Sequence, residues 1–79
     1  MTASAFVFRS QPTGPFKDLD AVRLGRSLET DDGLMPAGSE GTVVGVWRAG
    51  AAYEVEFSEP FHAVETVNVE DLGPASARG

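Results

Sequence analysis

The clearest pattern in this chain is the alternation of apolar and polar residues over residues 52–57 (AYEVEF). Successive side chains of a β-strand point to opposite faces, so this alternation predicts a strand with one buried and one exposed face. The apolar residues of the predicted inner face are Tyr53, Val55 and Phe57. The outer face carries the two acids that alternate with them, Glu54 and Glu56.

A first strand is predicted over residues 19–24 (LDAVRL), where Val22 and Leu24 mark the inner side. We interpret residues 25–40 as a long loop, because they contain an Asp-Gly turn signal and a type I turn with Pro36 at its second position. A loop of this length in a small domain is usually functional or held in place by its own apolar residues.

The strand predicted over residues 41–47 (GTVVGVW) is rich in β-branched residues, but two orientations fit it. In the first, Val44 and Val46 face the core and Trp47 turns outward. In the second, Val43 and Trp47 face inward. An outward Trp47 beside acids would indicate an interface, since Trp is enriched at binding hot spots, whereas an inward Trp47 would fill the core.

The last strand is predicted over residues 63–69 (AVETVNV), with Val67 and Val69 on the same side as Glu65. No segment has apolar residues at helical spacing over three turns, so no helix is predicted. Four or five short strands in so short a chain predict an all-β fold, a small and partly open barrel of about five short strands.

We expect one domain, formed by residues 16–72. Residues 1–15 are interpreted as a flexible tail that prolines and a glycine interrupt, and residues 73–79 as a disordered tail. The role of the N-terminal tail stays open, because residues 6–8 (FVF) would either pair with a sheet edge of a second copy or remain loose.

Composition narrows the function classes. The chain has 79 residues and is 42% hydrophobic, so wholesale disorder is not expected. It has no cysteine, which excludes disulfides and thiolate metal sites. It has no apolar run near the roughly 20 residues that a membrane helix needs, and its first residues do not resemble a secretory signal. We therefore expect a cytoplasmic protein that does not bind membranes.

The charge is strongly acidic, with twelve acidic and six basic residues and a net charge of −6. Residues 49–77 contain six acids and no Lys or Arg. Phosphate binding needs clustered Lys and Arg, so we do not expect a nucleic-acid partner. A basic protein partner would be attracted to this half of the chain. The alternative is that the acidic surface only keeps the domain soluble.

Candidate chemistry is sparse. His62 is the only histidine, and without cysteine beside it the chain predicts neither a nucleophile with its base nor a metal site of three or four ligands. Asp18, Asp20 and Glu29 fall on a calcium-loop template, but Arg23 occupies the position that needs Gly. We therefore predict no catalytic, metal or cofactor site, and we do not expect an enzyme.

The candidate partner-binding residues are acidic or aromatic. They either form an acidic docking face or are the solvated side of amphipathic strands and a loop. The full candidate set is Trp47, Glu54, Glu56, Glu65, Asp31 and Asp32.

Four segments follow one another in a recognisable order: DLDAVRL, GLMPAGSEGTVVGVW, AAYEVEF and TVNVEDL. In this order the chain resembles a group of small bacterial domains of unknown function with an SH3-like barrel. The resemblance covers about residues 16–72, and its most specific parts are residues 38–44 and 53–57. More distantly, the layout is similar to the SH3-like barrels of the nitrile hydratase β subunit, of a small accessory protein of photosystem I and of ferredoxin–thioredoxin reductase.

In those larger assemblies the barrel is a docking component or lobe, so the resemblance implies an SH3-like barrel and brings no catalytic residue to this chain. The stretch without Lys or Arg over residues 49–77, together with the absence of catalytic groups, predicts a non-enzymatic protein-binding domain with an acidic docking face. For the small relatives the resemblance implies gene neighbours that are candidate toxins, which favours an immunity or antitoxin protein that docks onto a basic enzyme. The alternative is an accessory subunit of a metalloenzyme or electron-transfer complex.

Overall fold

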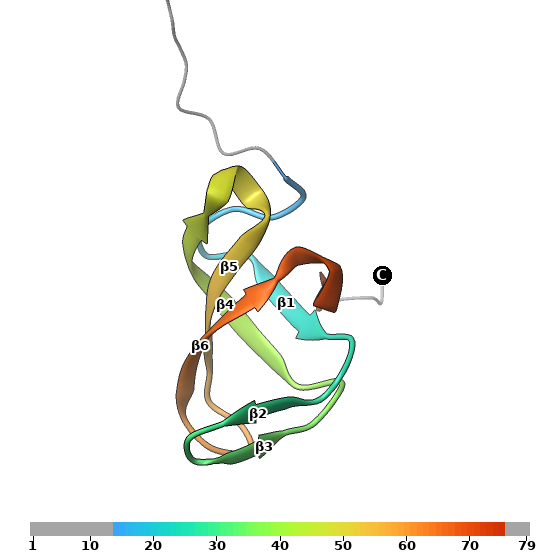
Figure 1. Cartoon of the computed structure of the whole chain (residues 1–79), viewed down its shortest axis with the longest axis vertical. Helices are drawn as coiled ribbons and strands as arrows, with labels where there is room; N and C mark the ends of the chain where they lie inside the picture. Colours follow the sequence, from blue (N-terminus) through green and yellow to red (C-terminus); the bar gives the residue numbers. More distant parts are fainter. Residues whose placement is uncertain (1–13, 76–79) are drawn as a thin grey trace, which may run out of the picture.

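The computed structural model describes residues 14–75, which form seven short β-strands and no α-helix. The strands are β1 (Ala21–Leu24), β2 (Leu28–Thr30), β3 (Gly33–Met35), β4 (Glu40–Trp47), β5 (Ala52–Phe57), β6 (Ala63–Asn68) and β7 (Leu72–Pro74). Two short 3-10 helices complete the described chain, η2 (Arg48–Gly50) between β4 and β5 and η3 (Val69–Asp71) between β6 and β7. Figure 1 shows these elements in sequence order.

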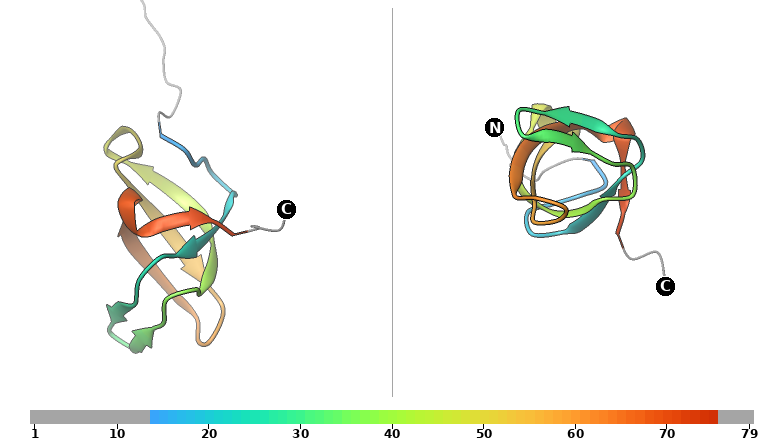
Figure 2. Two further views of the ribbon diagram at one scale, coloured as in Figure 1. Left: turned by 90° about the vertical axis from the view of Figure 1, so that its right-hand side faces the viewer. Right: turned by 90° about the horizontal axis from the view of Figure 1, so that it is seen from below.

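Five of the strands form one antiparallel sheet in the order β6-β5-β4-β1-β7, and β2 pairs with β3 in a separate hairpin. Seen from below in Figure 2, the curved sheet and the hairpin surround a common interior. Within residues 14–75 the two sheets do not close into one hydrogen-bonded barrel. The predicted small, partly open all-β fold is therefore confirmed.

The core is built from alternate residues of the central strands, as the alternation predicted. The largest fully buried side chains are Val22, Leu24, Met35, Val43, Tyr53, Val55 and Phe57. Each buried side chain of this size stabilises the fold by about 1.5–3 kcal/mol. Tyr53 also accepts a hydrogen bond at its hydroxyl from the backbone N–H of Phe16, at 3.3 Å, and the two rings meet edge to face.

A β-bulge in β4 decides the orientation that the sequence left open. The pairing of β4 with β5 shifts register between Val43 and Gly45, so that Val44 is an extra residue without a partner across the strand. Val43 is consequently buried, whereas Val44 and Trp47 are both exposed. Each of the two predicted orientations is thus half right: Trp47 turns outward, but Val43 rather than Val44 faces the core.

The long loop predicted over residues 25–40 contains regular structure, which corrects the sequence interpretation. Leu28 pairs with Met35, and Thr30 pairs with Gly33, to form the β2–β3 hairpin. Met35 is fully buried, so it holds the hairpin against the core. Strands of three residues are too short to produce a readable alternation, and this explains why the pattern missed them.

The C-terminal boundary also differs from the expected one. Gly73 and Pro74, which were placed in a disordered tail, belong to β7 and pair with β1, and Ala75 is buried. Pro74 is compatible with a strand here because β7 lies at the edge of the sheet, where its missing N–H leaves no ladder bond unmade. The tail interpretations for residues 1–13 and 76–79 lie outside the described residues.

Gly41 offers a direct test of this packing. A Cβ atom at this position would lie 2.7 Å from the Glu56 carbonyl oxygen and 2.9 Å from Cδ1 of Phe57, closer than van der Waals contact allows. We expect Gly41→Ala to lower the free energy of unfolding by about 1–3 kcal/mol, measured by urea denaturation.

Gly73→Ala is the matched control, because a Cβ at Gly73 would meet nothing within 4 Å. We expect this substitution to change the free energy of unfolding by less than about 0.5 kcal/mol. Equal effects of the two substitutions would contradict the described register of β4 against β5.

Candidate functional site

The strands β4, β5 and β6 present a common face to solvent, on the side away from the core. Directly paired residues of antiparallel strands point to the same side of the sheet, so the pairing defines this face row by row. We call its three rows the outer face: Trp47, Ala52 and Asn68; Gly45, Glu54 and Thr66; and Thr42, Glu56 and Val64. Ala52 belongs to this face by its pairing, although it is only 2% exposed.

Trp47 is the largest side chain of the outer face, and it is 51% exposed. It stands at the end of β4, after the bulge has changed the side to which this strand's residues point. Val44, in the bulge, and Val64, on β6, are also exposed. Trp47, Arg48, Ala52, Thr66 and Asn68 line a small depression of about 220 Å³. An aromatic residue at such a depression is typical of a protein-docking surface.

Two of the predicted acids lie on the outer face. Glu54 is half-buried between Gly45 of β4 and Thr66 of β6. Glu56 is exposed, and its Oε2 lies 2.9 Å from Nε2 of His62. The side chains of His62 and Glu56 are 67% and 46% exposed, so the contact contributes about 0–1 kcal/mol to stability.

Glu65 does not join the outer face, which corrects its place in the predicted docking set. It pairs with Val55, whose side chain is in the core, so Glu65 points to the inner side of the sheet and is half-buried there. The alternation along β6 requires this, because Val67 two residues later is also buried.

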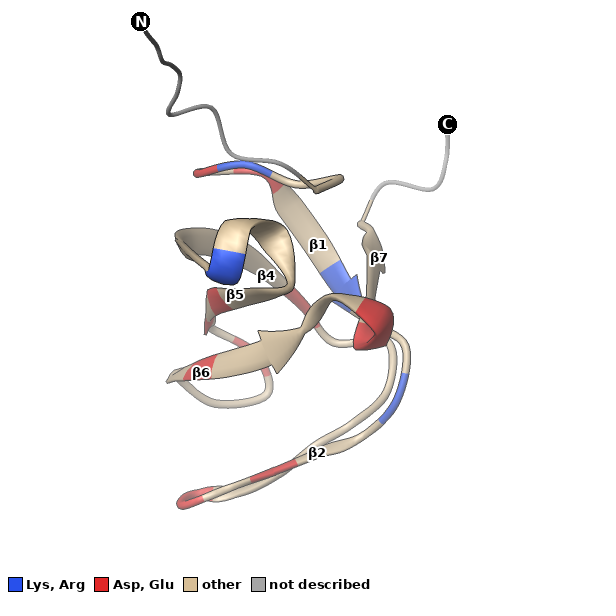
Figure 3. Cartoon of the chain, turned by 45° about the horizontal axis from the view of Figure 1, so that its top comes forward, with Lys and Arg blue, Asp and Glu red and all other residues tan. Residues whose placement is uncertain are grey.

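Asp31 and Asp32 are likewise separate from the outer face. They lie between β2 and β3, at the tip of the hairpin, where the N–H of Asp32 donates to Oγ1 of Thr30. Figure 3 shows this acidic tip apart from the acids of the five-stranded sheet. The structure therefore brings together Trp47, Glu54 and Glu56 and leaves out the other three candidates.

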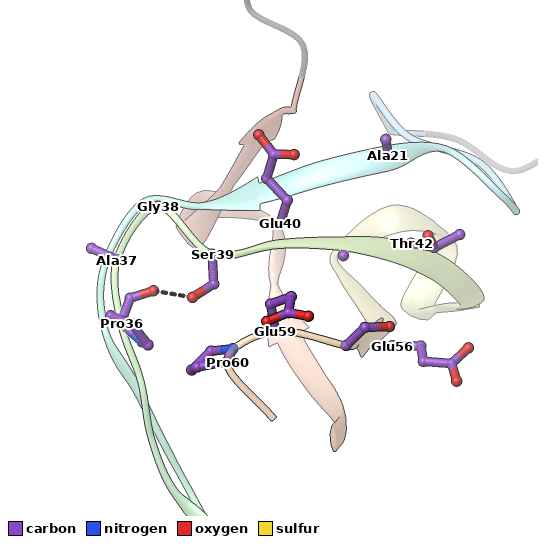
Figure 4. Close-up of a pocket in the computed structure, with 12 residues that line it drawn as sticks. Ala21, Pro36, Ala37, Gly38, Ser39, Glu40, Thr42, Glu56, Glu59 and Pro60 are labelled. Atoms are coloured by element: carbon purple, nitrogen blue, oxygen red, sulfur yellow. Dashed lines mark hydrogen bonds between the residues drawn. The ribbon is translucent and has the colours of Figure 1, made fainter. Parts of the chain in front are cut away.

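An open cleft of about 710 Å³ adjoins the outer face, shares Thr42 and Glu56 with it, and was not predicted from the sequence. It runs between residues 36–42 and residues 56–60, with Glu40, Glu56 and Glu59 among its lining residues (Figure 4). Ser39 donates a hydrogen bond from Oγ to the Pro36 carbonyl oxygen at 2.7 Å, which fixes one wall. Only strand pairing brings these two segments together, so no local sequence signal marks the cleft.

The chemistry available at these surfaces is that of carboxylates and hydroxyls. Within residues 14–75, no group of three or more His, Cys, Asp or Glu side chains is arranged to hold a metal ion. The same residues contain no helix that is long and apolar enough to cross a membrane.

Charge is distributed unevenly over the described residues. They include all twelve acids of the chain but only four of its six basic residues. Three of these four form ion pairs, Lys17 with Asp20, Arg23 with Glu40 and Arg26 with Asp71. No ion pair between residues 14 and 75 involves Glu54, Glu59 or Glu65. The outer face and the cleft therefore carry acids that a basic partner can neutralise.

Comparisons of this chain with protein-family models, with curated proteins and with solved structures each found no match.

The position of Trp47 predicts an unusual stability result for the only tryptophan of the chain. Because its side chain is half exposed, we expect Trp47→Ala to lower the free energy of unfolding by no more than about 1 kcal/mol. Phe57, which is fully buried, serves as the contrast, and we expect Phe57→Ala to cost about 3–5 kcal/mol. A loss of similar size for both substitutions, measured by urea denaturation, would place Trp47 in the core.

Proposed function

We propose that this chain is a non-enzymatic, acidic, SH3-like protein-binding domain that docks onto a basic protein through the outer face. The observation that carries the proposal is the half-exposed Trp47, which shares this face with Glu54 and Glu56. An aromatic anchor on the same face as two acids provides both apolar contact area and charge complementarity.

The exposure of Trp47 supports this proposal because burial would stabilise so small a domain. A tryptophan brings roughly 150–250 Å² of contact area to a core or an interface. The core of this chain uses Tyr53 and Phe57 and leaves Trp47 in solvent. A bound partner would cover the indole ring together with Val44 and Val64, which are also exposed.

The charge of the outer face supports a basic partner. Glu54 has no ion pair within the described range, and residues 49–77 contain no Lys or Arg. Arg48 lines the depression beside Trp47, but Glu54 and Glu56 together leave the outer face net acidic. A basic surface would therefore meet an acidic one, and this complementarity speeds association and makes it sensitive to salt.

One specific form of the proposal is an immunity or antitoxin protein that neutralises a basic enzyme. The resemblance to small bacterial SH3-like domains supports this form. The identity of the bound protein separates it from the alternative, an accessory subunit of a metalloenzyme or electron-transfer complex. A basic toxin as the partner supports the first form, and an enzyme complex supports the second.

The test is to purify the full chain from its native genetic context and to identify the protein that binds it. With that protein, isothermal titration should give a Kd that rises at least tenfold for Trp47→Ala and for Glu54→Lys, which corresponds to about 1.4 kcal/mol or more. Asp31→Lys introduces the same charge change at the hairpin tip and should leave the Kd within about threefold.

Two outcomes would overturn the proposal. A chain that purifies without a partner would remove its basis. A partner whose affinity is unchanged by Trp47→Ala and Glu54→Lys would show that binding occurs on another surface.

A further inference from the structure

The five-stranded sheet has two edges, and they differ in their protection against pairing with another strand. At one edge, β7 has only three residues and includes Gly73 and Pro74, and a proline cannot donate to a neighbouring strand. At the other edge, β6 has six residues without Pro, Gly, Lys or a bulge against β5. Short length and proline therefore block pairing at β7, whereas β6 carries only one such device, the inward-pointing charge of Glu65.

The hydrogen-bond pattern shows which backbone groups of β6 point away from the sheet. The N–H of Val69 donates to the carbonyl oxygen of Ala51 at 2.9 Å, so these two residues form a hydrogen-bonded pair. Bonded and non-bonded pairs alternate along an antiparallel ladder, and the β5–β6 pairing continues without a register shift.

It follows that the odd-numbered residues of β6 form the backbone hydrogen bonds to β5. The even-numbered residues direct their N–H and C=O groups away from β5, toward the open edge of the sheet. The outward-directed residues are Val64, Thr66 and Asn68. No other strand within residues 14–75 pairs with this edge. The edge therefore offers a ladder of unused donors and acceptors to an incoming strand.

The side chains along this edge define the sequence that would fit it. Those of Val64, Thr66 and Asn68 belong to the outer face and are exposed, so they can pack against small or β-branched residues. Glu65 points to the inner side and has no ion pair in the described chain. With an added strand, Glu65 would form a non-hydrogen-bonded pair, in which the opposed side chains lie closest.

We propose that the edge of β6 binds an extended, basic strand of a partner protein, in antiparallel orientation and with Lys or Arg opposite Glu65. This proposal rests on the proposed function and names how the partner is held. The added strand would supply main-chain hydrogen bonds, and the cation opposite Glu65 would supply selectivity.

The charge favours this occupant over a second copy of the chain. Two copies would each bring a net charge of −6, and pairing β6 with itself would bring two acidic edges together. A basic strand replaces that repulsion by an ion pair at the middle of the edge.

The test uses seven-residue capped peptides of Thr and Val with a central Arg, added to the isotope-labelled full chain and followed by NMR. We expect the amide signals of Val64 and Thr66 to shift and their hydrogen exchange to slow at least tenfold. A peptide with central Glu should bind at least tenfold more weakly. Glu65→Gln should remove most of this preference while leaving the fold intact.

Methylation of the peptide backbone provides a matched control for edge pairing. When the Arg lies opposite Glu65, the peptide N–H groups at its third and fifth residues face β6, and those at its second and sixth residues face away. N-methylation at positions three and five should abolish binding, whereas the same two methyl groups at positions two and six should change the Kd by less than about threefold. Equal effects of the two patterns would overturn the proposal.

Other results identify a different occupant and also overturn it. If the amides of Val64 and Thr66 are already protected in the free chain, and Phe6→Ser exposes them, the edge is occupied by the chain's own N-terminal segment. If dilution exposes them, the occupant is a second copy. Absence of any shift at these amides at millimolar peptide would show that the edge binds no strand of this kind.

The failure of this proposal can be distinguished from the failure of the proposed function. Thr66→Pro removes an outward N–H and leaves the bonds to β5 in place, since Thr66 is not a bonded residue of that ladder. Suppose that Trp47→Ala weakens binding of the natural partner at least tenfold, whereas Thr66→Pro and Glu65→Gln do not. This result would support the proposed function and contradict strand addition at β6.

Discussion

The bulge between Val43 and Gly45 is the constraint on which the rest of the surface depends. Residues two apart on a regular strand point to the same side, so an unbroken β4 would place Val43 and Trp47 together in the core. One extra residue in the strand reverses this relation after Val44. The same strand thus contributes Val43 to the interior and Trp47 to the solvent-facing side.

The candidate surface follows from that reversal together with the regular alternation of β5 and β6. Both strands keep their core residues inside, and their outward residues extend the row that begins at Trp47. Because β6 is an edge strand among residues 14–75, this surface continues into an edge that no other described strand pairs with. Side-chain contact and main-chain pairing can therefore act on the same partner.

Most of the core could be predicted from the sequence, because β1 and β5 bury alternate residues as their pattern indicates. The bulge could not be predicted, since the run of Val and Gly in β4 fits either orientation of the strand. Likewise, β2, β3 and β7 have three residues each and gain their stability from pairing rather than from a local pattern. The candidate site was predicted in part: charge identified Glu65 as an acid for the docking face, but its pairing with Val55 directs it inward.

The account is tested most directly by the solvent exposure of Trp47 in the free and the bound chain. As the only tryptophan, it can be replaced biosynthetically by 5-fluorotryptophan, whose fluorine resonance shifts between H₂O and D₂O when the indole ring is exposed. The account predicts a clear solvent shift in the free chain and its loss when the natural partner binds. A buried ring in the free chain, or a ring that stays exposed in the complex, would contradict it.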